Sequence, residues 1–131
     1  AMNFFKVKFE NGTISNGHDL TLEVTDPQRR YLVERGYEGK EVIFGIRPED
    51  IQSEQIFLDS YPKSVVRSEV VVSELLGAET MLYSKVGDTE FIARVDARDY
   101  HNPGETVELG FNMNKAHFFD PETELVIRDQ A

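Results

Sequence analysis

The chain has 131 residues, enough for one compact domain or for two very small ones that share a core. Its net charge is −10, from 14 Lys and Arg against 24 Asp and Glu, which disfavours a general binder of nucleic acids or of anionic membranes. The lack of cysteine excludes disulfides and cysteine-ligated metal sites, and no apolar run reaches the roughly 18 residues that span a bilayer.

Alternation of apolar and polar residues with a period of two dominates the chain. At its start, Phe5, Val7 and Phe9 alternate with charged residues, which is typical of a strand with one buried face. The runs expected to form strands are 5–9, 20–24, 42–46, 56–58, 65–76, 80–86, 90–95, 106–111 and 125–127. Turn-forming dipeptides, such as Asn-Gly at 11–12 and 16–17, separate these runs. Short strands with regular turns predict an antiparallel barrel or sandwich rather than βαβ units.

One short helix is expected after the second strand. Asp26 is a candidate N-cap, Pro27 suits the first turn, and Gly36 suits a helix end after the segment 28–35. A helix of this length would cover one end of a small barrel. The expected fold class is therefore all-β, a small barrel of antiparallel strands with one short helix.

The segment 39–46 resembles the segment 104–111. Both read Gly, two polar residues, Val, any residue, an apolar residue, Gly and an apolar residue. Each predicts a turn that leads into a strand, and the late glycines, Gly45 and Gly110, would permit a bulge or a sharp bend. The similarity indicates either a duplicated β unit or chance, and the barrel prediction holds in both cases.

Motifs for common enzyme chemistry are missing. The glycines at 12 and 17 have the spacing of a phosphate-binding loop, but the Lys and Ser or Thr that should follow are absent. The sequence contains neither the dinucleotide-binding Gly-x-Gly-x-x-Gly nor the nucleophile motif Gly-x-Ser-x-Gly. Asp99 with His101, or His117 with Asp120, would hold a metal only if the fold brought them together. We therefore assign no catalytic residue, cofactor or metal ligand.

The segment Arg47-Pro48-Glu49-Asp50 follows an expected strand and is a candidate contact site. Pro48 should end the strand because proline lacks the N–H that the sheet ladder needs. Arg47 would then pair with Glu49, with Asp50 or with the neighbouring strand, or it would contact a partner directly.

Two further segments carry candidate contact residues. The segment 74–79 is a strand interrupted at Gly77, which predicts a bulged turn or an exposed loop used in subunit contact. His117 and Phe119 share one face of a strand end, which predicts a core Phe beside a hydrogen-bonded His. The full set of candidate dimer or regulatory residues is Arg47, Glu49, Asp50, Glu74, Leu76, Gly77, Glu79, His117 and Phe119.

These segments resemble, in the same order, elements of one known family. The opening Met-Asn-Phe-Phe at 2–5 resembles the hinge after the nucleotide-binding domain of sugar-importing ABC ATPases. The segment 45–51 resembles their G-[IV]-R-P-E-x-[IL] signature, and 74–80 resembles their E-x-L-G-x-E-[ST] segment. Arg-Val at 94–95 and the closing segment 104–120 complete the match. The chain is thus similar to the C-terminal regulatory domain, of TOBE or OB-like type, of a maltose/multiple-sugar-type importer ATPase.

The resemblance implies that residues 1–131 form this regulatory domain, as one unit or with two OB-like sub-barrels inside it. It implies that ATP and Mg bind to a separate ATPase domain in cis, so that this fragment holds no cofactor while the full-length protein couples ATP hydrolysis to sugar uptake. The implied partners are a second copy of this domain, which would tether two ATPase subunits, the membrane subunits of the transporter, and in some members a regulatory protein. The implied location is the cytoplasm, peripheral on the inner face of the cell membrane. A small-ligand module that binds oxyanions is the alternative function.

Overall fold

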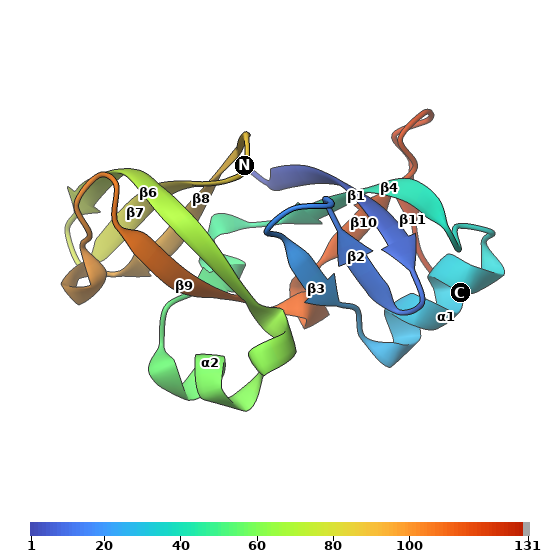
Figure 1. Ribbon diagram of the computed structural model, residues 1–131, viewed down its shortest axis with the longest axis horizontal. Coiled ribbons are helices and arrows are strands. Elements are labelled where there is room, and N and C mark those ends of the chain that lie inside the picture. The colour runs from blue at the N-terminus through green and yellow to red at the C-terminus, as the bar shows by residue number, and fades with distance from the viewer. Residues whose placement is uncertain (130–131) are drawn as a thin grey trace.

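The computed structural model describes residues 1–129, whose strands form two antiparallel sheets (Figure 1). The first sheet contains β1 (Asn3–Glu10), β2 (Thr13–Ser15), β3 (Thr21–Glu23), β4 (Lys40–Ile46), β10 (His117–Phe119) and β11 (Val126–Ile127). The second contains β5 (Ile51–Gln52), β6 (Val65–Leu76), β7 (Glu79–Val86), β8 (Thr89–Asp96) and β9 (Thr106–Phe111). The helical segments are α1 (Asp26–Glu34), α2 (Gln55–Ser60), η1 (Pro48–Asp50), η2 (Pro62–Ser64), η3 (Ala97–Asp99) and η4 (Met113–Lys115).

The strand order confirms the all-β prediction. It is β11-β10-β4-β1-β2-β3 in the first sheet and β5-β9-β6-β7-β8 in the second. The two edge strands of the second sheet, β5 and β8, lie against each other, which nearly closes that sheet into a five-stranded barrel. Closure of this kind leaves few unpaired backbone groups at the sheet edges.

One aromatic core joins the two sheets. Phe5 and Phe44 from the first sheet contact Phe111 from the second, with ring centroids 6.1 and 6.2 Å away, and Phe91 lies 5.5 Å from Phe5. Phe118 packs on Phe44 at 5.8 Å. The inward positions of both sheets therefore belong to a single hydrophobic cluster.

Helix α1 forms where the sequence predicted a helix, but its N-cap is Thr25 and not Asp26. The Thr25 side chain accepts a hydrogen bond from the Gln28 N–H at 3.3 Å, and the Gln28 side chain accepts one from the Thr25 N–H at 2.9 Å. This reciprocal pair is a capping box, in which two otherwise unpaired backbone donors are satisfied. Leu32 is fully buried and anchors the helix on the core.

Helix α2 replaces a predicted strand, so the prediction for residues 56–58 is wrong. Ile56 is 81% exposed and Leu58 is buried, so the two residues do not share a buried strand face. Three residues of alternation are too short to separate a strand from a helical turn. Pro62 then begins η2, where its fixed φ and missing N–H are tolerated.

The two similar segments of the sequence are equivalent in the structure. Gly39 and Gly104 both have positive φ, 74° and 89°, and lead into β4 and β9. A 3₁₀ turn with the same backbone hydrogen bond follows each strand: the Asp50 N–H donates to the Arg47 carbonyl at 3.0 Å, and the Lys115 N–H donates to the Asn112 carbonyl at 2.9 Å. These correspondences favour a duplicated unit over chance.

The strand after each unit pairs with the other unit. Gln52 in β5 lies opposite Gly110 in β9, while His117 in β10 lies opposite Gly45 in β4. Each sheet is thus completed by a strand from the other half of the chain. The exchange ties the two sheets together through the backbone as well as through the core.

The bulge expected at the late glycines is absent. Strand pairing runs without a shift past Gly45 and Gly110, and the bulge lies between Val70 and Val72. The glycines instead leave room for neighbouring side chains, since a Cβ on Gly110 would lie 2.4 Å from the Phe57 ring. Close approach of neighbouring side chains is a physical reason for glycine at these positions.

Candidate functional site

Arg47 directly follows β4 and contacts β10, the strand that pairs with β4. Its Nη1 lies 3.3 Å from Nε2 of His117 in β10, which pairs with β4. Of the pairings that the sequence allowed, the one with the neighbouring strand is observed, and within residues 1–129 Arg47 forms no ion pair with Glu49 or Asp50. Pro48 is buried and begins η1, which confirms that the strand ends there.

The core phenylalanine of β10 is Phe118, so the prediction for Phe119 is wrong. Phe118 is fully buried, whereas Phe119 is half-buried and points to the other side of the strand. There it meets the exposed ring of Phe4 edge-on, with centroids 5.8 Å apart. His117 lies on the same outer side, and its contact is Arg47.

The candidates Glu74, Leu76, Gly77 and Glu79 lie at the tip of the β6–β7 hairpin. Gly77, with φ 63°, starts the turn between the strands, so the segment is an exposed hairpin turn without a bulge. Leu76 is 53% exposed and lies opposite Glu79. Oε2 of Glu79 lies 3.9 Å from Nε of Arg94 on β8.

The outer face of the second sheet carries a row of apolar side chains. Val72 lies opposite Tyr83, which lies opposite Ile92, and none of the three is buried. The next row is Glu74, Met81 and Arg94. Cross-strand neighbours on one face are in contact, so these side chains form a continuous surface. We call the surface formed by Val72, Glu74, Leu76, Met81, Tyr83 and Ile92 the outer face.

Paired charges border the outer face. Lys85 Nζ lies 3.8 Å from Glu69 Oε2 on one side, and Arg94 faces Glu79 on the other. These pairs are exposed, so each contributes little to stability. They offset part of the acidic charge of this surface, on which Glu74 and Glu90 form no ion pair within residues 1–129.

The nine sequence candidates form two groups. The first comprises Arg47, His117 and Phe119, where β4 ends beside β10, with Glu49 and Asp50 in the adjacent η1. The second is the hairpin tip. We call the first the β4–β10 group. Within residues 1–129 no hydrogen bond or ion pair joins a member of one group to a member of the other. The hairpin group is continuous with the outer face, and the β4–β10 group is a separate surface.

The histidine and aspartate pairs considered as metal ligands have other partners. Nδ1 of His101 lies 3.0 Å from Oε2 of Glu105, and Asp99 accepts a hydrogen bond from the Ser53 hydroxyl at 2.6 Å. Among residues 1–129 no group of three or more His, Asp or Glu side chains could hold a metal ion. No helix in the same part of the chain is long and apolar enough to cross a membrane.

Asp120 is the acceptor of a compact hydrogen-bond cluster. The Tyr37 hydroxyl donates to its Oδ2 at 2.6 Å, and the backbone N–H groups of Thr123 and Glu122 donate to its Oδ1 at 2.8 Å. The bond from Tyr37, followed by those from Thr123 and Glu122, lowers the pKa of Asp120 to about 2. The same bond, followed by burial, raises the pKa of Tyr37 to about 12. The cluster fixes the turn between β10 and β11.

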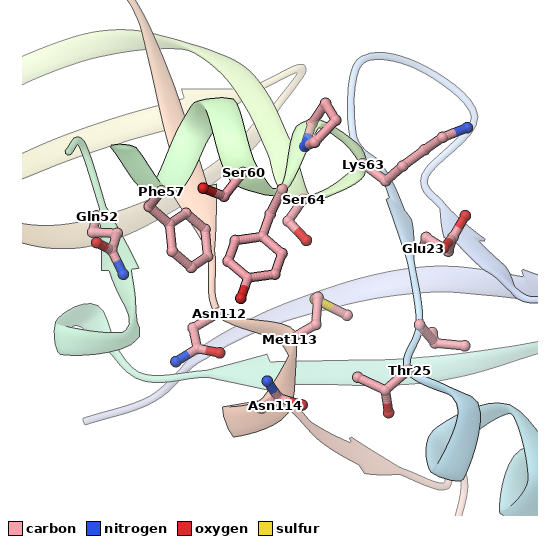
Figure 2. Close-up of a pocket in the computed structure, with 13 residues that line it drawn as sticks. Glu23, Thr25, Gln52, Phe57, Ser60, Lys63, Ser64, Asn112, Met113 and Asn114 are labelled. Carbon is pink, nitrogen blue, oxygen red and sulfur yellow. The ribbon is translucent and has the colours of Figure 1, made fainter. Parts of the chain in front are cut away.

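A cleft that the sequence analysis did not identify lies between α2, η2 and η4 (Figure 2). Its volume is about 600 Å³, and its walls include Gln52, Phe57, Tyr61, Asn112 and Asn114. The similarity of 39–46 to 104–111 could have indicated the cleft. Asn112 follows β9 as Arg47 follows β4, and Gln52 lies opposite Gly110 as His117 lies opposite Gly45. The two equivalent places differ in chemistry: one holds an Arg–His contact and the other an open cleft with amides.

Two family descriptions match the chain. Residues 1–51 match the MalK OB fold domain, and residues 44–119 match the TOBE domain. Among solved structures, the cytoplasmic molybdate-binding protein ModG superposes with a TM-score of 0.69 over 91% of this chain and 96% of its own, at 14% identity. At that identity the likeness concerns the fold alone.

The chain is also similar to ATP-binding proteins of sugar importers. It is 56% identical over 128 residues to the multiple sugar-binding transport ATP-binding protein MsmK of Streptococcus mutans and 50% identical to the oligosaccharides import ATP-binding protein MsmX of Bacillus subtilis, in both cases over 98% of the chain. The trehalose/maltose import ATP-binding protein MalK of Thermococcus litoralis is 35% identical over 93% of the chain. The chain spans about a third of the length of each relative (34%, 35% and 33%). The chain belongs to the TOBE domain family.

Proposed function

We propose that this chain is the C-terminal regulatory and dimerisation domain of the ATP-binding subunit of a carbohydrate ABC importer. The full-length subunit would couple ATP hydrolysis to sugar uptake while bound to the membrane subunits of the transporter, in the cytoplasm at the inner face of the membrane. This assignment is supported by the names of the relatives that share nearly the whole chain. In this proposal the domain itself carries out no chemistry.

The mechanical role of the domain would be to hold two ATPase subunits together. If two copies of the domain stay paired, reclosure of the attached ATPase domains is intramolecular, at an effective concentration on the order of mM for short flexible connections. The contact would be isologous, one patch on its own copy, because two-fold dimers predominate among homo-oligomers.

The observation that carries the dimer proposal is the apolar row on the outer face. Two copies together carry a formal charge of 2 × −10 = −20, so the paired surface must be apolar or locally neutral. The row of Val72, Tyr83 and Ile92 is such a surface, and its borders pair Glu69 with Lys85 and Glu79 with Arg94. Repulsion between the remaining acidic surfaces is screened by salt, so dimerisation should strengthen as salt rises.

Sedimentation of the 131-residue chain, from micromolar to near-millimolar concentration and at low and high salt, tests the proposal. We expect a monomer–dimer equilibrium whose dissociation constant falls with salt. Val72→Glu should raise that constant about tenfold or more, because it places a charge in the patch that the proposed dimer would bury. Val126→Glu is the matched control, since Val126 is similarly exposed (42% against 47%) but lies on β11 of the first sheet. A monomer under all conditions, or equal effects of the two substitutions, would contradict the proposed pairing.

A further inference from the structure

The cleft between α2, η2 and η4 presents an aromatic ring that is held in place yet exposed. Phe57 lies against Gly110, where the missing side chain leaves space for its ring. Tyr61 packs on Phe57 with centroids 4.8 Å apart, and its N–H donates to the Phe57 carbonyl at 2.9 Å. Even so, Tyr61 is 54% exposed, and it lines the cleft beside Phe57.

Three amide side chains line the same cleft as Tyr61. Gln52 comes from β5, while Asn112 and Asn114 come from the end of β9 and from η4 (Figure 2). The backbone of Asn112 is fixed, because its N–H donates to the Asp50 carbonyl at 2.9 Å. Within residues 1–129 the structure gives none of the three side-chain amides a hydrogen-bond partner. Each amide can donate two hydrogen bonds and accept others, so the cleft offers donors and acceptors side by side.

The charge in the cleft selects against an anion. The charged side chains of the lining are Lys63 and Glu23, one of each sign, so their formal charges cancel. An oxyanion site would instead need an excess of basic groups or a nest of backbone N–H groups. The cleft therefore suits a neutral ligand rich in hydroxyl groups.

We propose that this cleft binds a saccharide of one or two rings. A pyranose ring has an apolar C–H face that can lie on the Tyr61 ring, and a rim of hydroxyls that both donate and accept hydrogen bonds, as Gln52, Asn112 and Asn114 do. The volume of about 600 Å³ lies within the range of small-molecule sites. This site goes beyond dimerisation and does not depend on it, because the outer face lies on other strands.

The test is an NMR titration of the ¹³C,¹⁵N-labelled 131-residue chain with maltose as the probe. We expect saturable shifts of the side-chain amide signals of Gln52, Asn112 and Asn114 and of the Tyr61 ring. Tyr61→Ala should weaken maltose binding about tenfold or more. Tyr100→Ala is the matched control, since Tyr100 is 50% exposed but lies outside the cleft, and it should leave binding unchanged.

Asn112→Ala tests the site without changing the aromatic ring, and it should also weaken maltose binding. An unchanged backbone amide spectrum in each variant would show that the variant is folded. Absence of saturable shifts, or shifts scattered over both sheets, would overturn the proposal. It would also be overturned if phosphate or molybdate, and not maltose, shifted the amide signals of the cleft. The same holds if those signals shifted only with protein concentration, because a second copy of the chain would then occupy the cleft.

Discussion

Two serines of β6, Ser68 and Ser73, are both buried but differ in hydrogen bonding. The Ser73 hydroxyl donates to the His101 carbonyl and accepts from the His101 N–H, whereas the Ser68 hydroxyl has no partner within residues 1–129. A buried hydroxyl without a partner costs free energy. We expect Ser68→Ala to leave the free energy of unfolding unchanged or to raise it by up to ~1 kcal/mol, and Ser73→Ala to lower it by about 1 kcal/mol. Urea unfolding with a constant m-value measures both, and equal losses in the two variants would contradict the assignment.

The hydrogen bond from Tyr37 to Asp120 makes the stability of the fold depend on pH. The folded-state pKa of Asp120 is lowered to about 2, so its contribution to stability is present above the ordinary value of 3.8 and is lost as pH falls through about 2. Tyr37→Phe removes the largest cause of the shift, so the pKa of Asp120 should rise toward 3.8. A ¹³C NMR titration of the carboxyl group measures this change. Tyr100→Phe should leave the pKa of Asp120 where it is, and an unshifted pKa in Tyr37→Phe would refute the explanation.

At the scale of elements, local signals in the sequence located most strands and the first helix. The run 106–111 was predicted with its observed ends because Val107, Leu109 and Phe111 recur at every second position and are all buried. The failures are short: three residues at 56–58 could not define a period, and the choice of Thr25 as N-cap depended on the reciprocal bond with Gln28. The exchange of β5 and β10 between the units was not predictable either, since strand pairing depends on distant parts of the chain.

Gly110 sets how closely α2 can approach β9, because its missing side chain leaves room for the Phe57 ring. A Cβ at Gly110 would lie 2.4 Å from Phe57 and 3.1 Å from Leu58, so Gly110→Ala must displace the helix. We expect it to lower the free energy of unfolding by about 1–3 kcal/mol, as overpacking does. In a Phe57→Ala background the loss should be smaller, which a double-mutant cycle detects. Thr106→Ala, at an exposed site on the same strand, is the control and should change stability by no more than ~0.5 kcal/mol.

At the scale of the whole molecule, the family-like segments pointed to the right class of protein but not to its surfaces. The candidates near Arg47 and those at the hairpin tip proved to be separate groups. Of the outer face, the sequence analysis identified only Glu74 and Leu76, because Val72, Tyr83 and Ile92 become neighbours only when three strands pair. The sequence analysis did not identify the cleft for the same reason, because its walls come from residues as distant in the chain as Glu23 and Asn114.

The exchanged strands and the shared aromatic core predict that both sheets unfold together. β10 follows β9 of the second sheet yet pairs with β4 of the first, and Phe44 contacts Phe111 across the sheets. In a residue-resolved NMR titration with urea, amides of Val7 in the first sheet and Leu82 in the second should lose their native signals at one midpoint. Gly110→Ala, although it lies in the second sheet, should lower the midpoint for Val7 as much as for Leu82. If the first sheet kept its native signals after the second had lost them, the two halves would be independent domains, and neither the strand exchange nor the common core would couple their stability.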